Sequence, residues 1–165
     1  MSIQQRFKSQ RIASFGFSLV ELMITVAVIT ILAAIAVASY TKSVVKTNRS
    51  AATACLSEYA NYMERYYTSN LRYDQAPASS GTAAPVANPV LGATPTLVLD
   101  CASTAQTGNN YQYQVPAASA TAYTVQATPI NAQLTRDTQC GTLTLNQRGS
   151  RTDSGTGTVT QCWGG

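Results

Sequence analysis

One acidic residue, Glu21, lies near the start of an apolar run that extends from residue 16 to residue 38. Placing Asp, Lys or Arg at the centre of a membrane helix costs roughly 2.5 to 3.5 kcal/mol. An ionisable group in such surroundings is therefore a functional-site candidate, and its chemistry requires a positively charged partner. The alternative is that Glu21 lies near a helix end and reaches the membrane interface.

The residues before this run are basic. Arg6, Lys8 and Arg11 stand in a polar segment without an acid, and Gly16 is followed by the sequence FSLVEL. Because cationic residues collect on the cytoplasmic side of a membrane segment, we expect the N-terminus inside and the remaining chain outside. Over residues 11 to 36 this pattern resembles the class III signal sequence of bacterial type IV prepilins.

The resemblance implies a partner for Glu21. In type IV prepilins a membrane aspartyl peptidase cuts after the glycine, here between Gly16 and Phe17, and the new amine on Phe17 is N-methylated. The acid at the position of Glu21 pairs in that family with the terminal amine of a neighbouring subunit. Since desolvation cancels much of the attraction in a buried ion pair, this pair would set the register between subunits more than it stabilises them.

An ordinary secretory signal peptide is the alternative for the same segment. Ala36-Val37-Ala38 matches its A-x-A site, and cleavage there would release a soluble domain that begins at Ser39. However, an ordinary apolar region has about 7 to 15 residues, which is shorter than this run, and it does not need an acid. The first residue of the mature protein, Phe17 or Ser39, distinguishes the two.

Composition excludes several classes of function. The chain has 165 residues, a formal net charge of +4 and no histidine, which is the commonest general base and metal ligand. Three of its eleven Lys and Arg lie in residues 1–16, so the later residues carry eight basic and seven acidic side chains. We therefore expect no enzyme, no cofactor and no bound metal, and the basic balance does not indicate a nucleic-acid partner.

Two groups of charged residues in the C-terminal half are weaker candidates. Three acids that calcium would accept as ligands are Asp100, Asp137 and Asp153. Three arginines that could contact DNA phosphates are Arg136, Arg148 and Arg151. Isolated acids in loops are usually solvated, and arginines mixed with acids are typical of an ordinary surface. We therefore expect neither calcium nor nucleic acid as a partner.

The four cysteines indicate two disulfides, because the count is even and the chain faces outward. Three connectivities are possible, and we expect Cys55–Cys101 and Cys140–Cys162. The first would join the end of the long helix to the segment before the sheet, and the second would close a C-terminal loop. There is no C-x-x-C pair, so a thiolate metal site is not expected.

Periodicity predicts a helical half and a strand half. Apolar spacing near 3.6 continues past the apolar run and predicts one helix from Phe17 to about Thr68. Its apolar stripe consists of Val44, Val45, Ala52, Cys55, Tyr59, Met63 and Tyr66. The proline-rich residues 75–100 predict a loop, with a short strand at Leu97–Leu99.

Short alternating runs predict an antiparallel sheet. They lie at residues 111–115, 122–127, 140–145 and 158–163, with a turn at 146–149. The expected packed face consists of Tyr111, Tyr113, Val115, Tyr123, Val125, Leu143 and Leu145. A long helix packed on this sheet is an α+β fold. We divide the chain into a cleaved leader (1–16), a transmembrane or filament-core helix (17–39) and a periplasmic head domain (40–165).

The C-terminal half carries a second resemblance. The motif D-x-x-C-G-T-L-T-L from Asp137 to Leu145, with Gly149, Arg151 and the pair Cys162-Trp163, resembles the PilE-type minor pilins of gammaproteobacteria, as does the helix at 54–67. It implies the type IV pilin fold and a structural subunit of a pilus for twitching motility, adhesion and DNA uptake. The implied partners are the prepilin peptidase, the inner-membrane assembly platform, the major pilin and other minor pilins.

The same resemblance implies a location. The chain would cross the inner membrane once, with a cytoplasmic N-terminus, and then enter the extracellular filament. Three alternatives stay open: the major pilin of the same system, a type II secretion pseudopilin, and a secreted soluble binding domain.

Replacing Glu21 with Ala tests its expected role in assembly. The variant should still insert and be processed, because the leader and the apolar run are unchanged, but it should enter filaments poorly. Immunoblots of whole cells and of sheared pili measure the two steps separately. Normal incorporation of the variant into filaments would contradict the assignment.

Overall fold

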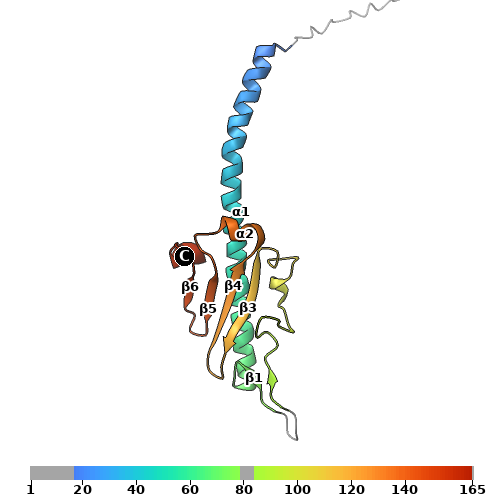
Figure 1. Cartoon of the computed structure of the whole chain (residues 1–165), viewed down its shortest axis with the longest axis vertical. Coiled ribbons are helices and arrows are strands. Elements are labelled where there is room, and N and C mark those ends of the chain that lie inside the picture. Colours follow the sequence, from blue (N-terminus) through green and yellow to red (C-terminus); the bar gives the residue numbers. More distant parts are fainter. Residues whose placement is uncertain (1–16, 79–83, 165) are drawn as a thin grey trace, which may run out of the picture. The chain divides into compact units, whose positions relative to one another are not determined.

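Helix α1 (Leu19–Asn70) is the longest element of the computed structural model, which describes residues 17–78 and 84–164 (Figure 1). Its sequence contains neither Gly nor Pro, the two residues that most weaken a helix interior, so its 52 residues form one uninterrupted helix. Leu71, with φ 56°, adopts the left-handed conformation that commonly follows a helix end. The predicted helix is confirmed to within two residues at each end.

The chain divides into two compact units, Met1–Tyr40 and Thr41–Gly165. In the described part of the first unit, the large apolar side chains of α1 are exposed, from 48% for Val28 to 75% for Leu19. Two hydroxyls in this stretch bond within the helix, Thr25 to the carbonyl of Leu22 and Thr30 to that of Ala27. Among the described residues, α1 is the one helix long and apolar enough to cross a membrane.

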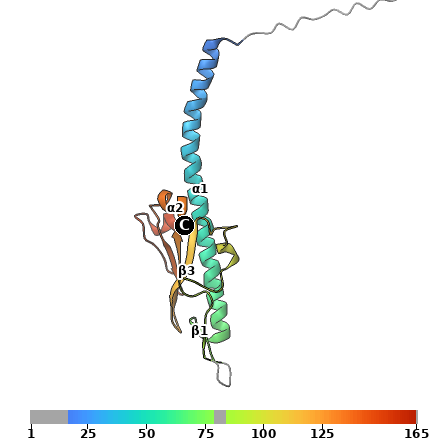
Figure 2. The same ribbon diagram turned by 45° about the vertical axis from the view of Figure 1, so that its right-hand side comes forward.

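The second unit is built on a four-stranded antiparallel sheet. Its strands are β3 (Tyr111–Ala118), β4 (Tyr123–Pro129), β5 (Leu143–Asn146) and β6 (Arg151–Asp153), and each pairs with the next along the chain. Buried and more exposed residues alternate along β3, β4 and β5, as expected when one face is packed. Figure 2 shows the sheet along one side of the later half of α1.

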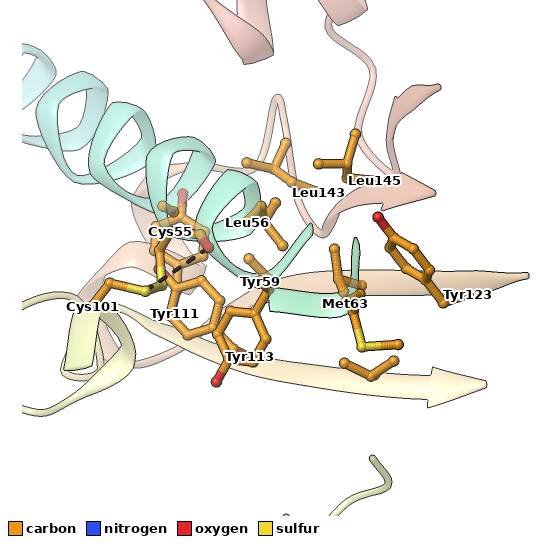
Figure 3. Packing of buried hydrophobic residues seen from close by; sticks show 14 of the residues in the cluster. Cys55, Leu56, Tyr59, Met63, Cys101, Tyr111, Tyr113, Tyr123, Leu143 and Leu145 are labelled. Atoms are coloured by element: carbon orange, nitrogen blue, oxygen red, sulfur yellow. Dashed lines mark hydrogen bonds between the residues drawn. A yellow bond between two sulfur atoms is a disulfide. The ribbon is translucent and has the colours of Figure 1, made fainter. Parts of the chain in front are cut away.

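The core lies between this sheet and α1 (Figure 3). The buried residues of the helix are Ala52, Cys55, Leu56, Tyr59 and Met63. All seven residues of the predicted sheet face are buried, and the ring of Tyr113 stacks on that of Tyr59 with centroids 5.8 Å apart. The predicted α+β fold, a long helix on an antiparallel sheet, is confirmed.

Residues between helix and sheet form short, irregular elements. Strand β1 (Gln75–Ala76) pairs with β2 (Val86–Ala87), and a 3-10 helix, η1, covers Asp100–Ala102. Cys101 of η1 is joined to Cys55 of α1, with Cα atoms 5.5 Å apart. The strand predicted at Leu97–Leu99 is wrong, because no neighbouring strand pairs with these residues within the described chain.

The C-terminal segment corrects a second prediction. Residues 158–163 were expected to form a strand, but Val159–Trp163 forms helix α3, and β6 supplies the last strand. Thr158 accepts a hydrogen bond from the Gln161 amide while the Gln161 side chain accepts one from the Thr158 amide. This reciprocal capping favours a helix start over a strand, and Gly164, with φ 71°, ends the helix.

Helix α2 (Asn131–Arg136) was also not expected, and it carries a buried polar network. Asp137, 2% exposed, pairs with Arg49 of α1, which is 14% exposed. The carboxylate also accepts hydrogen bonds from the Tyr111 hydroxyl (2.9 Å) and from the Gln133 side chain (3.0 Å). Burial, and then the charge of Asp137, raises the pKa of Tyr111, so its hydroxyl remains a donor. The network fastens α2 to both α1 and the sheet.

A second polar contact lies farther along α1, at Glu64. The hydroxyls of Tyr73 and Tyr123 both donate to its carboxylate at 3.1 Å. Burial and the bond to Glu64 raise the pKa of Tyr73 to about 12. Helix and sheet are therefore held together by polar contacts on both sides of the apolar core.

Replacing Asp137 with Ala should lower the free energy of unfolding by about 3 to 5 kcal/mol, because it leaves Arg49 without its buried partner. Asp74→Ala is the matched control, since Asp74 pairs with Arg72 at a more exposed position, with side chains 23% and 40% accessible. Solvent screens such a pair, so the control should lose much less. Urea unfolding of the full chain in detergent measures both, and equal losses would contradict a structural role for the network.

Candidate functional site

The residues expected to act in assembly lie in the first unit. Glu21 and Phe17 are exposed, and no hydrogen bond or ion pair to Glu21 is found within residues 17–78 and 84–164. Gly16 and the rest of the leader lie outside the described residues. Among residues 17–40, Glu21 is the sole charged side chain. A charged partner would therefore have to come from the terminal amine or from another molecule.

The four cysteines form two disulfides. One joins Cys55 to Cys101 and the other joins Cys140 to Cys162, each with Cα atoms 5.5 Å apart. The second bond ties α3 to the loop that follows α2, next to the buried Asp137. The disulfide thus joins the two ends of the segment 140–162, which restricts the conformations open to β6 and to the loop after it.

Arg148 and Arg151 lie on the hairpin formed by β5 and β6. Arg148 is in the turn, which is closed by a hydrogen bond from the Gly149 amide to the carbonyl of Asn146 at 2.9 Å. Gly149 has φ 73°, a conformation that favours glycine. The Arg151 guanidinium lies 5.3 Å from the centre of the Trp163 ring, where the attraction between cation and aromatic face orients it.

Arg136 lies elsewhere. It ends α2, which follows β4 beyond Pro129, whereas the β5–β6 turn lies beside Thr124 at the other end of β4 (Figure 1). Arg136 lines a hollow together with Lys42 and Lys46 of α1. The structure therefore brings together two of the three arginines, and it groups the third with lysines that the sequence analysis did not single out. No local pattern indicates this second group, because Arg136 is about 90 positions from the two lysines in the sequence.

The three acids considered for calcium do not come together. Asp137 is used by Arg49, Asp100 accepts a hydrogen bond from Gln106 at 2.5 Å, and Asp153 ends β6. Among the described residues, no group of three or more His, Cys, Asp or Glu is placed to hold a metal ion.

A second hollow, of about 410 Å³, lies between the β3–β4 turn and the β5–β6 turn. Its lining includes Ser119, Asn146, Gln147 and Arg148 and contains no acid. The side-chain oxygen of Gln147 accepts from the Tyr123 backbone amide at 3.3 Å, and the side-chain oxygen of Asn146 accepts from the backbone amides of Arg148 and Ser150 at 3.0 Å. Within the described residues the N–H groups of these two side chains donate to no protein acceptor, so they are available as donors beside Arg148.

Comparison with known proteins gives two family matches. Residues 38–144, well over half of the chain, match the family described as type IV minor pilin ComP, DNA uptake sequence receptor. Residues 12–37 match the prokaryotic N-terminal methylation motif. A solved type IV pilin from Shewanella oneidensis is 25% identical, over 65% of this chain and 89% of that chain, with a TM-score of 0.36. No curated protein matches the chain.

These findings decide between the expectations. The expected class, a type IV minor pilin, is confirmed, and the methylation motif indicates processing by a prepilin peptidase before assembly with other pilins. The expectation that nucleic acid is not a partner conflicts with the description of the family. That expectation relied on net charge and on the acids that lie near the three arginines in the sequence, whereas affinity for DNA depends on where individual cations lie in the folded protein.

The apolar helix and the methylation motif place the subunit in the inner membrane before assembly and in the extracellular pilus afterwards. The chain belongs to the ComP family of type IV minor pilins, and it is a structural subunit of the pilus.

Proposed function

We propose that this pilin subunit binds double-stranded DNA through the β5–β6 hairpin of its head domain. The observation that carries DNA as the ligand is the match of residues 38–144 to a family described as a DNA uptake sequence receptor; most of the hairpin lies beyond the matched residues, and its own side chains support it as the binding surface. The exposed side chains of Arg148 and Arg151 on one hairpin supply the positive charge that phosphate contacts require. Neither arginine forms an ion pair with the described residues, so both charges are available to a ligand.

The surroundings of Arg148 support a role in contacting bases as well as phosphates. Asn, Gln and Arg are the side chains that most often form paired hydrogen bonds with base edges in the major groove. Asn146, Gln147 and Arg148 are consecutive, and all three line the hollow between the two turns. With their oxygens engaged by backbone amides, the two carboxamides are held in place and present donors.

Arg151 is positioned by its neighbours. Trp163, 7% exposed, donates its ring N–H to the carbonyl of Thr152 at 3.1 Å, and it follows Cys162 of the second disulfide. Because the guanidinium lies over this fixed ring, Arg151 loses little freedom when it binds. Its donors remain suited to paired contacts with a phosphate.

The proposal includes the assembly steps that bring this surface to the outside. Cleavage between Gly16 and Phe17 removes the leader, the Phe17 amine is methylated, and Glu21 pairs with the terminal amine of a neighbouring pilin. The apolar helix then packs in the filament core, and residues 40–165 form the head domain. The methylation motif over residues 12–37 supports these steps.

Replacing both Arg148 and Arg151 with Ala should weaken binding to duplex DNA and make it less dependent on salt. Each lost phosphate contact lowers the slope of log K against log salt by about 0.9, so the pair should lower it by about 2. Fluorescence anisotropy of a labelled duplex, titrated with the detergent-solubilised chain at several salt concentrations, measures the slope.

Arg65→Ala combined with Arg136→Ala is the control, because it removes the same charge from other exposed positions. The control should keep the slope of the unmodified protein. If both double variants weaken binding equally, net charge rather than the hairpin accounts for it, and the proposed surface is wrong.

A further inference from the structure

A hollow at the α2 end of the head domain gathers three cations besides Arg49, which is paired with Asp137, and the proposed DNA surface uses none of the three. It has a volume of about 640 Å³ and is lined by Lys42 and Lys46 of α1 and by Arg136 of α2; we call it the cationic hollow. Lys42 and Lys46 are four residues apart, so they lie on the same side of the helix. All three side chains belong to exposed residues of the second unit.

The charge in the cationic hollow is not balanced by the protein. Its lining contains one acid, Asp137, which is buried and already paired with Arg49. Within the described residues, none of the three cations forms an ion pair. Like charges held near one another repel, so a bound anion would lower the free energy of this arrangement.

The position of the lysines in the chain indicates which anion they meet. A helix needs about 20 apolar residues to cross the hydrocarbon core of a bilayer. In α1 the segment from Leu19 to Ala38 has this length. Tyr40 follows, and tyrosine is enriched at the boundary between membrane and water. Lys42 and Lys46 come directly after it, at the depth of the lipid headgroups, where long cationic side chains reach phosphate.

These lysines also oppose the membrane orientation expected for the chain, in which residues after the apolar segment face outward. Lys and Arg near a membrane segment favour its cytoplasmic side, yet Lys42, Lys46 and Arg49 on the outer flank equal Arg6, Lys8 and Arg11 in number. Arg49 forms an ion pair with Asp137. Lys42 and Lys46 form no ion pair within the described residues, so no contact inside the protein accounts for two lysines on the outer flank.

We propose that the cationic hollow binds the phosphate headgroup of an anionic phospholipid, of the phosphatidylglycerol type, in the outer leaflet of the inner membrane. The three cations bind the lipid as long as the subunit is in the inner membrane. The subunit releases the lipid when it enters the filament. This role is independent of DNA binding at the β5–β6 hairpin.

The test uses the full chain in nanodiscs of phosphatidylcholine, with and without phosphatidylglycerol, and counts retained lipids by native mass spectrometry. The unmodified chain should retain phosphatidylglycerol in preference to phosphatidylcholine. In the variant Lys42→Gln, Lys46→Gln, Arg136→Gln, this preference should be weaker than in the unmodified chain, by about fivefold for each cation removed. Near-ultraviolet circular dichroism verifies that the variant is folded.

The matched control, Arg65→Gln, Arg148→Gln, Arg151→Gln, removes the same charge elsewhere and should keep the preference. The basic leader is present in every sample, so its own affinity for anionic lipid cancels in the comparison. Equal losses in the two triple variants, or equal retention of the two lipids by the unmodified chain, would overturn the proposal. So would a hollow variant that keeps phosphatidylglycerol but loses salt-dependent binding to duplex DNA, since the hollow would then serve nucleic acid.

Discussion

The rest of the molecule depends on one continuous helix, α1, whose first half suits an apolar environment and whose second half packs against the head domain. From Leu19 to Tyr40 it offers apolar side chains on all sides, which suits lipid and then other pilins. From Thr41 onward the apolar side chains narrow to one stripe, and five buried residues of that stripe support the head domain. The absence of Gly and Pro between Leu19 and Asn70 keeps both parts in one helix.

The head domain is held on this helix by apolar packing and by specific polar and covalent contacts around it. Arg49 and Asp137 connect α1 to α2, Glu64 connects it to β4, and the bond from Cys55 to Cys101 connects it to η1. Apolar packing alone specifies register weakly, whereas the buried Asp137 carboxylate meets its three partners, Arg49, Tyr111 and Gln133, in one arrangement. A head held in this way can present surface side chains in fixed positions, which is what recognition of a ligand requires.

The positions of the cationic side chains in this protein indicate possible ligands better than the net charge does. Beyond the leader, positive and negative side chains nearly cancel in number, yet five head-domain cations that form no ion pair within the described residues gather at two places. One group, on the β5–β6 hairpin, stands beside carboxamides and an aromatic ring, and the other stands just after the membrane segment. In the two proposals made above, different neighbours suit the two groups to different phosphates, those of DNA and those of lipid.

The sequence by itself determined the features that depend on neighbours in the chain: the prepilin-like N-terminus, the long helix, the first three strands of the sheet and the residues on its packed face. Periodicity reports these because burial repeats every 3.6 or 2 residues. The tertiary structure alone decided that Asp137 is a buried partner of Arg49, that Arg136 joins Lys42 and Lys46, and that residues 159–163 form a helix closed against Cys140. The first two depend on contacts between residues 88 or more positions apart, which no local pattern records; in the third, a capping pair and a disulfide outweighed a short alternation.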